Sequence, residues 1–112
     1  MNPLDIYKET EYRHLTTKEI THRLLLTIRA DAKDINSGIN QEPTALHAMQ
    51  SLFMLSEHLN PQLPEEEYIS LHNILWKLNS EFNKIVTRQA EILPKAVEDS
   101  LSFLIDSVAG RN

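Results

Sequence analysis

The stretch YISLHNILWKLNSEFNKI, residues 68–85, decides the fold of this 112-residue chain. Its apolar residues recur in steps of 3-4-3-4-3, at Tyr68, Leu71, Leu75, Leu78, Phe82 and Ile85. This spacing places the six side chains on one stripe of an α-helix, the kind of seam that packs knobs-into-holes against neighbouring helices. The chain is therefore predicted to bury helices against helices, and we expect an all-α fold.

Two helices are predicted before this stretch. Thr16 and Glu19 have the spacing of a capping box, which opens the first helix. This helix should end at residues 36–37, with Gly38 as the left-handed residue that follows it. The second helix is predicted to begin near Pro43 and to end before Asn60. The apolar face of the first helix comprises Ile20, Leu24, Leu25, Ile28, Ala32 and Ile35, and that of the second comprises Ala45, Leu46, Met49, Leu52, Phe53, Leu55 and Leu59.

The third helix opens at Pro64, with three glutamates in its first turn, where they favour the positive end of the helix dipole. We expect it to run on to Ile92, which gives roughly 28 residues and a length of about 42 Å. Pro94 then breaks it, and a last helix covers residues 95–108. The connections are short, so successive helices should be antiparallel neighbours. We predict an antiparallel four-helix bundle over residues 16–110, preceded by a short N-terminal arm or helix over residues 1–15.

Composition excludes several classes of function. The absence of Cys rules out disulfides and thiolate metal sites. The net charge of −5 and the interleaving of basic with acidic residues argue against binding to nucleic acid. No apolar run of about 18 residues exists, so no membrane span is expected. The first residues lack the layout of a signal peptide, and we expect a cytoplasmic protein.

The residues with catalytic or metal-binding potential have simpler structural explanations. Glu11 and His14, like Glu19 and His22, have the spacing used in di-iron bundles, but that chemistry needs such pairs on two separate helices. Glu19 is better explained as part of the capping box. No serine elbow and no glycine-rich phosphate loop occur in the sequence. We expect a non-enzymatic protein without a metal or cofactor site.

Trp76 lies off the main seam, and with Ile69 and Ile74 it gives the third helix a second apolar strip. Two interpretations of this strip remain open. A central helix in a bundle contacts neighbours on two sides, so the strip could be core. Alternatively, Ile69 and Trp76 line a groove for the helix of a partner. The excess of apolar helix faces makes the chain a candidate homodimer or helix-in-groove binder.

Several segments resemble known bacterial families. Tyr7, followed at similar spacing by residues 16–20 and by Leu24-Leu25, resembles the start of the flagellin-specific export chaperones, and residues 70–78 are similar to their Ser-Leu-Tyr-Asp-Tyr-Met helix. Thr17 stands where that family has Pro, and Leu25 where it has Tyr. The small flagellin-biosynthesis regulators are about as close, through residues 17–20, 23–25, 63–65 and 105–110.

The resemblance implies a cytosolic chaperone that binds flagellin, or another secreted subunit, and shields it before export. Substrate segments would then order on apolar strips of the bundle. Tyr7 would lie on an arm that the substrate displaces. The partner-binding residues expected on this basis are Tyr7, Ile20, Leu24, Ile69, Leu71, Leu75 and Trp76. A rival hypothesis is a small dimeric regulatory adaptor of the antitoxin-like or transcription-factor-binding type.

Overall fold

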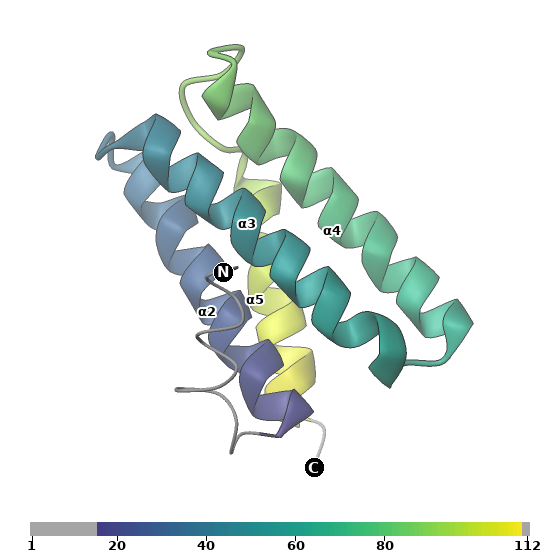
Figure 1. The fold of residues 1–112 in the computed structure, drawn as a ribbon. Helices are drawn as coiled ribbons and strands as arrows, with labels where there is room; N and C mark the ends of the chain where they lie inside the picture. Colours follow the sequence, from purple (N-terminus) through teal and green to yellow (C-terminus); the bar gives the residue numbers. More distant parts are fainter. Residues whose placement is uncertain (1–15, 111–112) are drawn as a thin grey trace, which may run out of the picture.

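The computed structural model describes residues 16–110 of the chain, with side chains up to residue 108. These residues form four helices: α2 (Thr17–Asn36), α3 (Gln41–Leu59), α4 (Glu65–Val86) and α5 (Lys95–Gly110). A single 3₁₀ turn, η2 (Asn60–Gln62), connects α3 to α4. Figure 1 shows α3 between α2 and α4, with α5 passing behind them. The prediction of an all-α helical bundle is confirmed, whereas the expected arm and Tyr7 lie outside the described residues.

Both ends of α2 follow the local signals in the sequence. Glu19 N–H donates to the hydroxyl of Thr16 over 3.1 Å, and that hydroxyl donates to the Glu19 carboxylate over 3.0 Å. At the other end Gly38 has a φ of 81°, in the left-handed region that an L side chain avoids. Its N–H donates to Ile35 O, while Ile39 N–H donates to Asp34 O. These two bonds are the Schellman arrangement, and they satisfy carbonyls that the helix end leaves without partners.

The third predicted helix is shorter than the sequence suggested. α4 ends at Val86 after 22 residues, so the expected continuation to Ile92 is wrong. The chain turns at Arg88, whose φ of 60° places a non-glycine residue in the left-handed region. Gln89 N–H then donates to Lys84 O over 2.8 Å, which closes a second Schellman-type end. α3 begins at Gln41, two residues before the predicted start, so Pro43 lies in its first turn. The N–H groups of the first turn have no acceptor within the helix, so the proline, which lacks an N–H, breaks no helical hydrogen bond there.

The connection between α4 and α5 is held by side chains at the end of α2 and the start of α3. Asn36 Oδ1 accepts from Leu93 N–H over 2.7 Å, and Asn36 Nδ2 donates to Leu93 O over 3.3 Å. Gln41 Nε2 donates to Ile35 O and to Glu91 O, at 2.9 and 2.6 Å. The Leu93 side chain, only 2% exposed, packs into the core at this point. These contacts anchor the start of α5 to α2 rather than to α4.

The helices pack as an incomplete bundle. α2 has extensive contacts with α3 and with α5, and α3 with α4, whereas α4 and α5 touch only sparsely. Phe82 is the largest of the fully buried side chains. The buried apolar residues are Leu24, Leu25, Ile28, Ala32, Ile35, Ala45, Ala48, Leu52, Leu55, Leu59, Leu75, Leu78, Phe82, Ile85, Leu93, Val97, Leu101, Leu104 and Ile105. Within residues 16–110, no helix combines the length and apolar character needed to cross a bilayer.

Candidate functional site

Two cavities lie beside the sparse contact between α4 and α5. The first, of about 720 Å³, is lined by residues from all four helices. The second, of about 420 Å³, is lined by α4, by the start of α5 and by Pro94 before it. We call the two cavities together the α4–α5 groove. On α4 it is lined by Ser70, Leu71, Ile74, Lys77, Leu78 and Glu81, and on α5 by Ala96, Val97, Ser100, Leu104, Ser107 and Val108.

The floor of the groove is apolar and its walls are low. Leu25, Leu55 and Leu59 contribute to the larger cavity from α2 and α3. On α5, the residues Ala96, Ser100 and Ser107 are small, which allows another backbone to approach closely. The residue spacing between Glu66 and Glu81 corresponds to about 22 Å along the helix axis, or four turns. The two cavities together therefore extend along α4 over the length of a helix of about 15 residues.

Charged residues occur at both ends of the groove rather than along its floor. Lys18, Glu66 and Glu67 line the larger cavity. Lys77 and Glu81 line the smaller one. Both signs of charge are present at the groove, so its rim is suited to the polar flanks of an amphipathic segment. Such rim charges steer and orient a partner more than they add affinity.

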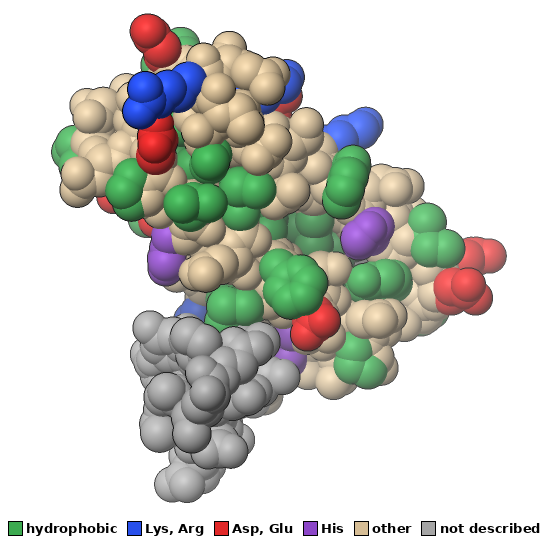
Figure 2. All heavy atoms as spheres, turned by 45° about the horizontal axis from the view of Figure 1, so that its top comes forward, with side chains coloured by type: hydrophobic (Ala, Val, Ile, Leu, Met, Phe, Trp, Pro, Cys, Tyr) green, Lys and Arg blue, Asp and Glu red, His purple; other side chains and the backbone are tan. Residues whose placement is uncertain are grey.

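A second apolar feature lies on the far side of α4, where α4 meets α3. Phe53 and Trp76 are 62% and 66% exposed, and Leu46 and Ile69 are 51% and 50% exposed. We call these four residues, with the polar positions between them, the outer α3–α4 surface. In Figure 2, apolar side chains spread over the face that α3 and α4 present, with an acidic side chain beside the central ones and further charged side chains toward the edges.

The hydrogen bonds between α3 and α4 fix how this surface is arranged. The Ser56 hydroxyl lies 3.0 Å from Tyr68 OH and 3.4 Å from His72 Nδ1. Phe53 is one turn before Ser56, and Trp76 is one turn after His72. Because α3 and α4 run antiparallel, both aromatic side chains are displaced along the junction in the same direction. Phe53 and Trp76 therefore stand at one level on the two neighbouring helices.

The residues that the sequence predicts to bind a partner lie in different parts of the structure. Leu24 and Leu75 are core residues, 5% and 3% exposed. Ile20 and Leu71 are partly buried against the core, and of these two Leu71 lines the groove. Ile69 and Trp76 lie together on the outer α3–α4 surface, so Leu71 and Trp76 belong to different sides of α4. Tyr7 lies outside the described residues.

The sequence pattern indicates only part of the α4–α5 groove and only part of the outer α3–α4 surface. The groove residues Ala96, Ser100 and Ser107 gave no signal of their own, because small residues are also common on exposed helix faces. Leu46 and Phe53 were expected on the apolar face of their helix, but the structure leaves both exposed. A signal was available for them, since residues 43–56 contain no Asp, Glu, Lys or Arg. Charged residues are depleted at the centres of contact surfaces, and the nearest charges on this face are Glu42 and Glu57, one turn from Leu46 and from Phe53.

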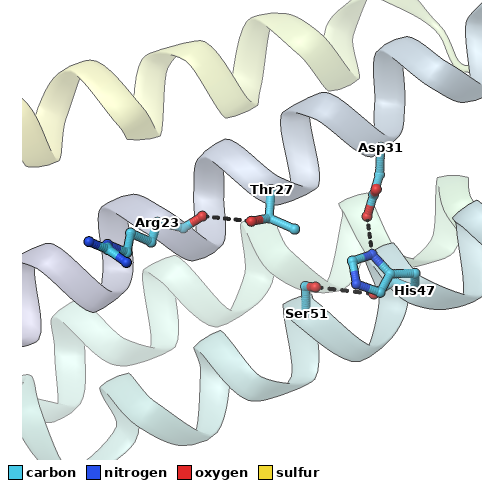
Figure 3. Close-up of polar contacts among 5 residues, drawn as sticks. All are labelled: Arg23, Thr27, Asp31, His47 and Ser51. Atoms are coloured by element: carbon cyan, nitrogen blue, oxygen red, sulfur yellow. Dashed lines mark hydrogen bonds and ion pairs between the residues drawn. The ribbon is translucent and has the colours of Figure 1, made fainter. Parts of the chain in front are cut away.

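A Ser, a His and an Asp meet between α2 and α3, as Figure 3 shows. His47 Nδ1 lies 2.6 Å from Asp31 Oδ2, and the Asp31 side chain is only 13% exposed. Burial raises the pKa of Asp31 above its ordinary value, while His47 opposes that rise. A catalytic triad needs the serine hydroxyl on the imidazole nitrogen. Here Ser51 Oγ donates instead to the main-chain carbonyl of His47 over 3.1 Å, so the three residues form no triad.

The same cluster has a structural role. Thr27 Oγ1 donates to the main-chain carbonyl of Arg23 within α2, in the same way that Ser51 bonds back within α3 (Figure 3). The Asp31–His47 contact is the one that joins the two helices in this view. In the part of the chain that the structure describes, no group of three or more His, Asp or Glu side chains is arranged to hold a metal ion.

Among known proteins, no family model, no curated protein and no solved structure matches this chain. What the chain binds must therefore follow from the chemistry of its own surfaces.

Proposed function

We propose that the protein is a non-enzymatic helical module that binds an apolar, helix-forming segment of another protein in the α4–α5 groove. The observation that carries this proposal is the open seam of the bundle. α4 packs on α3 and α5 packs on α2, but the two helices leave an apolar cavity of about 720 Å³ between them. A bundle that serves only stability closes such a seam, because close-packed interiors are more stable than interiors with voids.

A docked helix would complete the bundle. Apolar side chains repeating at i, i+3, i+4 and i+7 would enter the larger cavity over Leu71 and Leu104. Each large aliphatic side chain fully buried in this way contributes about 1.5–3 kcal/mol before the ordering of the partner is paid for. Three such anchors give a gross gain of roughly 4–9 kcal/mol. Association itself costs about 4–15 kcal/mol, so affinity in the micromolar range, about 8 kcal/mol net, needs further contacts along the groove besides these three anchors.

The resemblance to the flagellin-specific export chaperones suggests the kind of partner. Flagellin, or another subunit that polymerises after export, has apolar segments that must stay shielded while the subunit is in the cytosol. A groove that takes one helix and releases it at the export machinery serves that purpose. In this proposal the protein is a cytosolic chaperone, and the groove residues act by covering the apolar segment rather than by chemistry.

The test is a binding titration with the full-length protein and monomeric flagellin from the organism that encodes the chain. Ser107→Trp places a bulky side chain in the groove, and Asp106→Trp places the same side chain at the neighbouring, exposed position. We expect Ser107→Trp to weaken binding at least tenfold and Asp106→Trp to leave it within twofold, with the helical circular dichroism of both variants unchanged. Equal affinities for the two variants would refute the groove as the site. Failure of the wild-type protein to bind flagellin would refute flagellin as the partner.

The rival function, a dimeric regulatory adaptor, is favoured by one observation of its own. The outer α3–α4 surface exposes two aromatic side chains, and aromatic residues are enriched in interfaces between subunits. The two functions are compatible, since the groove and this surface lie on different sides of α4.

A further inference from the structure

We infer that the α4–α5 groove selects a helix that carries a basic residue at one end, and that Glu66 and Glu67 are the residues that recognise it. This inference rests on the helix-binding function proposed above and adds the charge of the segment that is bound. Three observations carry it: the apolar lining of the larger cavity, the carboxylates at the edge of that cavity, and the different charge at the smaller cavity.

The larger cavity offers room and apolar contact for the anchors of a helix. Its volume of about 720 Å³ is typical of pockets that bury a ligand. Two of its hydroxyl groups are already used within the protein, since Thr21 Oγ1 donates to Thr17 O and Ser107 Oγ donates to Phe103 O, both over 2.8 Å. Charged acceptors form stronger hydrogen bonds than neutral ones, so the carboxylates at the edge are the strongest polar contacts that this cavity offers. The aliphatic side chains that line the cavity are Leu25, Leu55, Leu59, Leu63, Leu71, Leu104 and Val108.

The edge of the larger cavity has an excess of negative charge. Glu66 and Glu67 are exposed in the first turn of α4 and line this cavity. Neither carboxylate forms a hydrogen bond or an ion pair within residues 16–108. Among the described side chains that line the cavity, Lys18 is the only basic one. A lysine or arginine of a partner is therefore attracted to this edge, whereas a carboxylate is repelled.

The smaller cavity has the opposite balance of charge. Lys77 and Glu81 line it, but Glu81 Oε1 accepts from Lys84 Nζ over 3.1 Å, so the Glu81 charge is compensated within α4. Lys77 is exposed and has no such partner among the described residues. The spacing from Glu67 to Lys77 corresponds to about 15 Å along α4. This exceeds the Debye length of about 8 Å at physiological ionic strength, so the two ends act separately on a docked helix. A basic residue is favoured at one end of the groove only, and the groove therefore favours one direction of the bound helix.

The selected segment has a defined chemistry. Large aliphatic side chains at i, i+3, i+4 and i+7 enter the larger cavity, and one or two Lys or Arg residues follow at the same end. An exposed ion pair of this kind raises affinity by a factor of about 1.5–5. Two pairs should therefore give at least about threefold at low ionic strength, and the gain should shrink as salt is added.

The experiment measures the binding of two designed peptides to the full-length protein by fluorescence anisotropy at low ionic strength. Both peptides have about 15 residues, blocked ends and leucines at i, i+3, i+4 and i+7, and they differ only in two Lys or two Gln residues at one end. The measured quantity is the ratio of the affinity for the Lys peptide to that for the Gln peptide. We expect a ratio of at least three for the wild type and a ratio near one for the double variant Glu66→Gln/Glu67→Gln.

The matched control is the double variant Glu57→Gln/Glu65→Gln. It removes the same two charges from exposed positions that do not line the groove, and Glu65 lies in the same first turn of α4. This control should keep the ratio of the wild type. A ratio near one for the wild type would overturn the inference. So would a wild-type ratio in Glu66→Gln/Glu67→Gln, or an equal loss in the control, because the net charge of the chain would then explain the preference.

Ser107→Trp distinguishes a failure of this inference from a failure of the proposed function. It should weaken binding of the Gln peptide at least tenfold. If Ser107→Trp binds this peptide as tightly as the wild type does, or if the wild type binds neither peptide, the groove itself is refuted and the inference with it. If Ser107→Trp blocks the Gln peptide but the wild type does not prefer the Lys peptide, only the selection by Glu66 and Glu67 is overturned.

Discussion

Replacing Asn36 with Ala tests how the start of α5 is anchored to α2. The Asn36 amide makes two hydrogen bonds to the main chain of Leu93, at 2.7 and 3.3 Å. The bond to Leu93 O contributes about 1 kcal/mol, and the Leu93 N–H left without a partner costs about 1–2 kcal/mol. Ala is a better helix former than Asn by roughly 0.5 kcal/mol, which offsets part of the loss. The free energy of unfolding should therefore fall by about 1.5–2.5 kcal/mol.

Urea unfolding followed by circular dichroism measures this change. Trp76 fluorescence is a poor probe, because the side chain is already 66% exposed in the folded chain. With a urea m-value of about 1–1.5 kcal/mol/M, the midpoint should move down by about 1–2 M with the slope unchanged. The free energy of local opening at the Leu93 amide, measured by hydrogen exchange, should fall by a similar amount, so that this amide exchanges faster.

The control is Asn83→Ala, which changes the same residue type at an exposed position of α4. It should move the midpoint by the equivalent of less than about 0.5 kcal/mol. A fall in stability of less than about 0.5 kcal/mol for Asn36→Ala, with the Leu93 amide still protected, would refute the anchoring role.

Three other perturbations test separate parts of the account. Gly38→Ala should lower the free energy of unfolding by about 1–2 kcal/mol by denaturant titration, because the φ of 81° disfavours any Cβ although no atom lies within 4 Å of one; an unchanged stability would contradict this. Burial raises the pKa of the Asp31 carboxyl, so the folded chain keeps the carboxyl proton to higher pH than the unfolded chain does. The free energy of unfolding of the wild type, relative to that of Asp31→Asn, should therefore decrease as the pH rises above 3.8, the ordinary pKa of an Asp side chain. Asp99→Asn, at an exposed position of α5, is the control for that titration, and a difference between wild type and Asp31→Asn that does not vary with pH would refute the assignment. Phe82→Ala should cost about 3–5 kcal/mol by thermal unfolding, because it empties a fully buried site, whereas Phe53→Ala should cost less than about 0.5 kcal/mol at protein concentrations where the chain is monomeric.

The helix ends show what the sequence can and cannot specify. The ends of α2 could be predicted because capping and the left-handed glycine are local interactions, made by residues within a few positions of each other. The end of α4 could not be predicted, because the left-handed residue there is Arg88 and not a glycine, so the sequence holds no local signal for it. The contacts from Asn36 and Gln41 that hold the following segment join residues about fifty positions apart. Such pairings depend on the tertiary arrangement.

The candidate site was predictable to a similar extent. The seam from Tyr68 to Ile85 was expected to be core, and Leu75, Leu78, Phe82 and Ile85 are buried. Of the second strip predicted from Ile69, Ile74 and Trp76, the structure exposes Ile69 and Trp76, whereas the inclusion of Ile74 was wrong, because Ile74 lies on the α5 side of α4 and packs partly against the core. The groove was not predictable, because it arises from the divergence of α4 from α5. Helical periodicity gives the face of a helix that is apolar, but not which neighbour covers it or whether any neighbour does.

The central claim is that the α4–α5 groove receives an apolar helix of a partner. Methyl NMR of the full-length chain, recorded with and without monomeric flagellin, tests it most directly. The account predicts that the methyl signals of Leu71, Ile74 and Val97 shift on binding, while those of Leu46 and Ile69 on the outer α3–α4 surface stay in place. Shifts confined to Leu46 and Ile69, with the groove methyls unmoved, would contradict it.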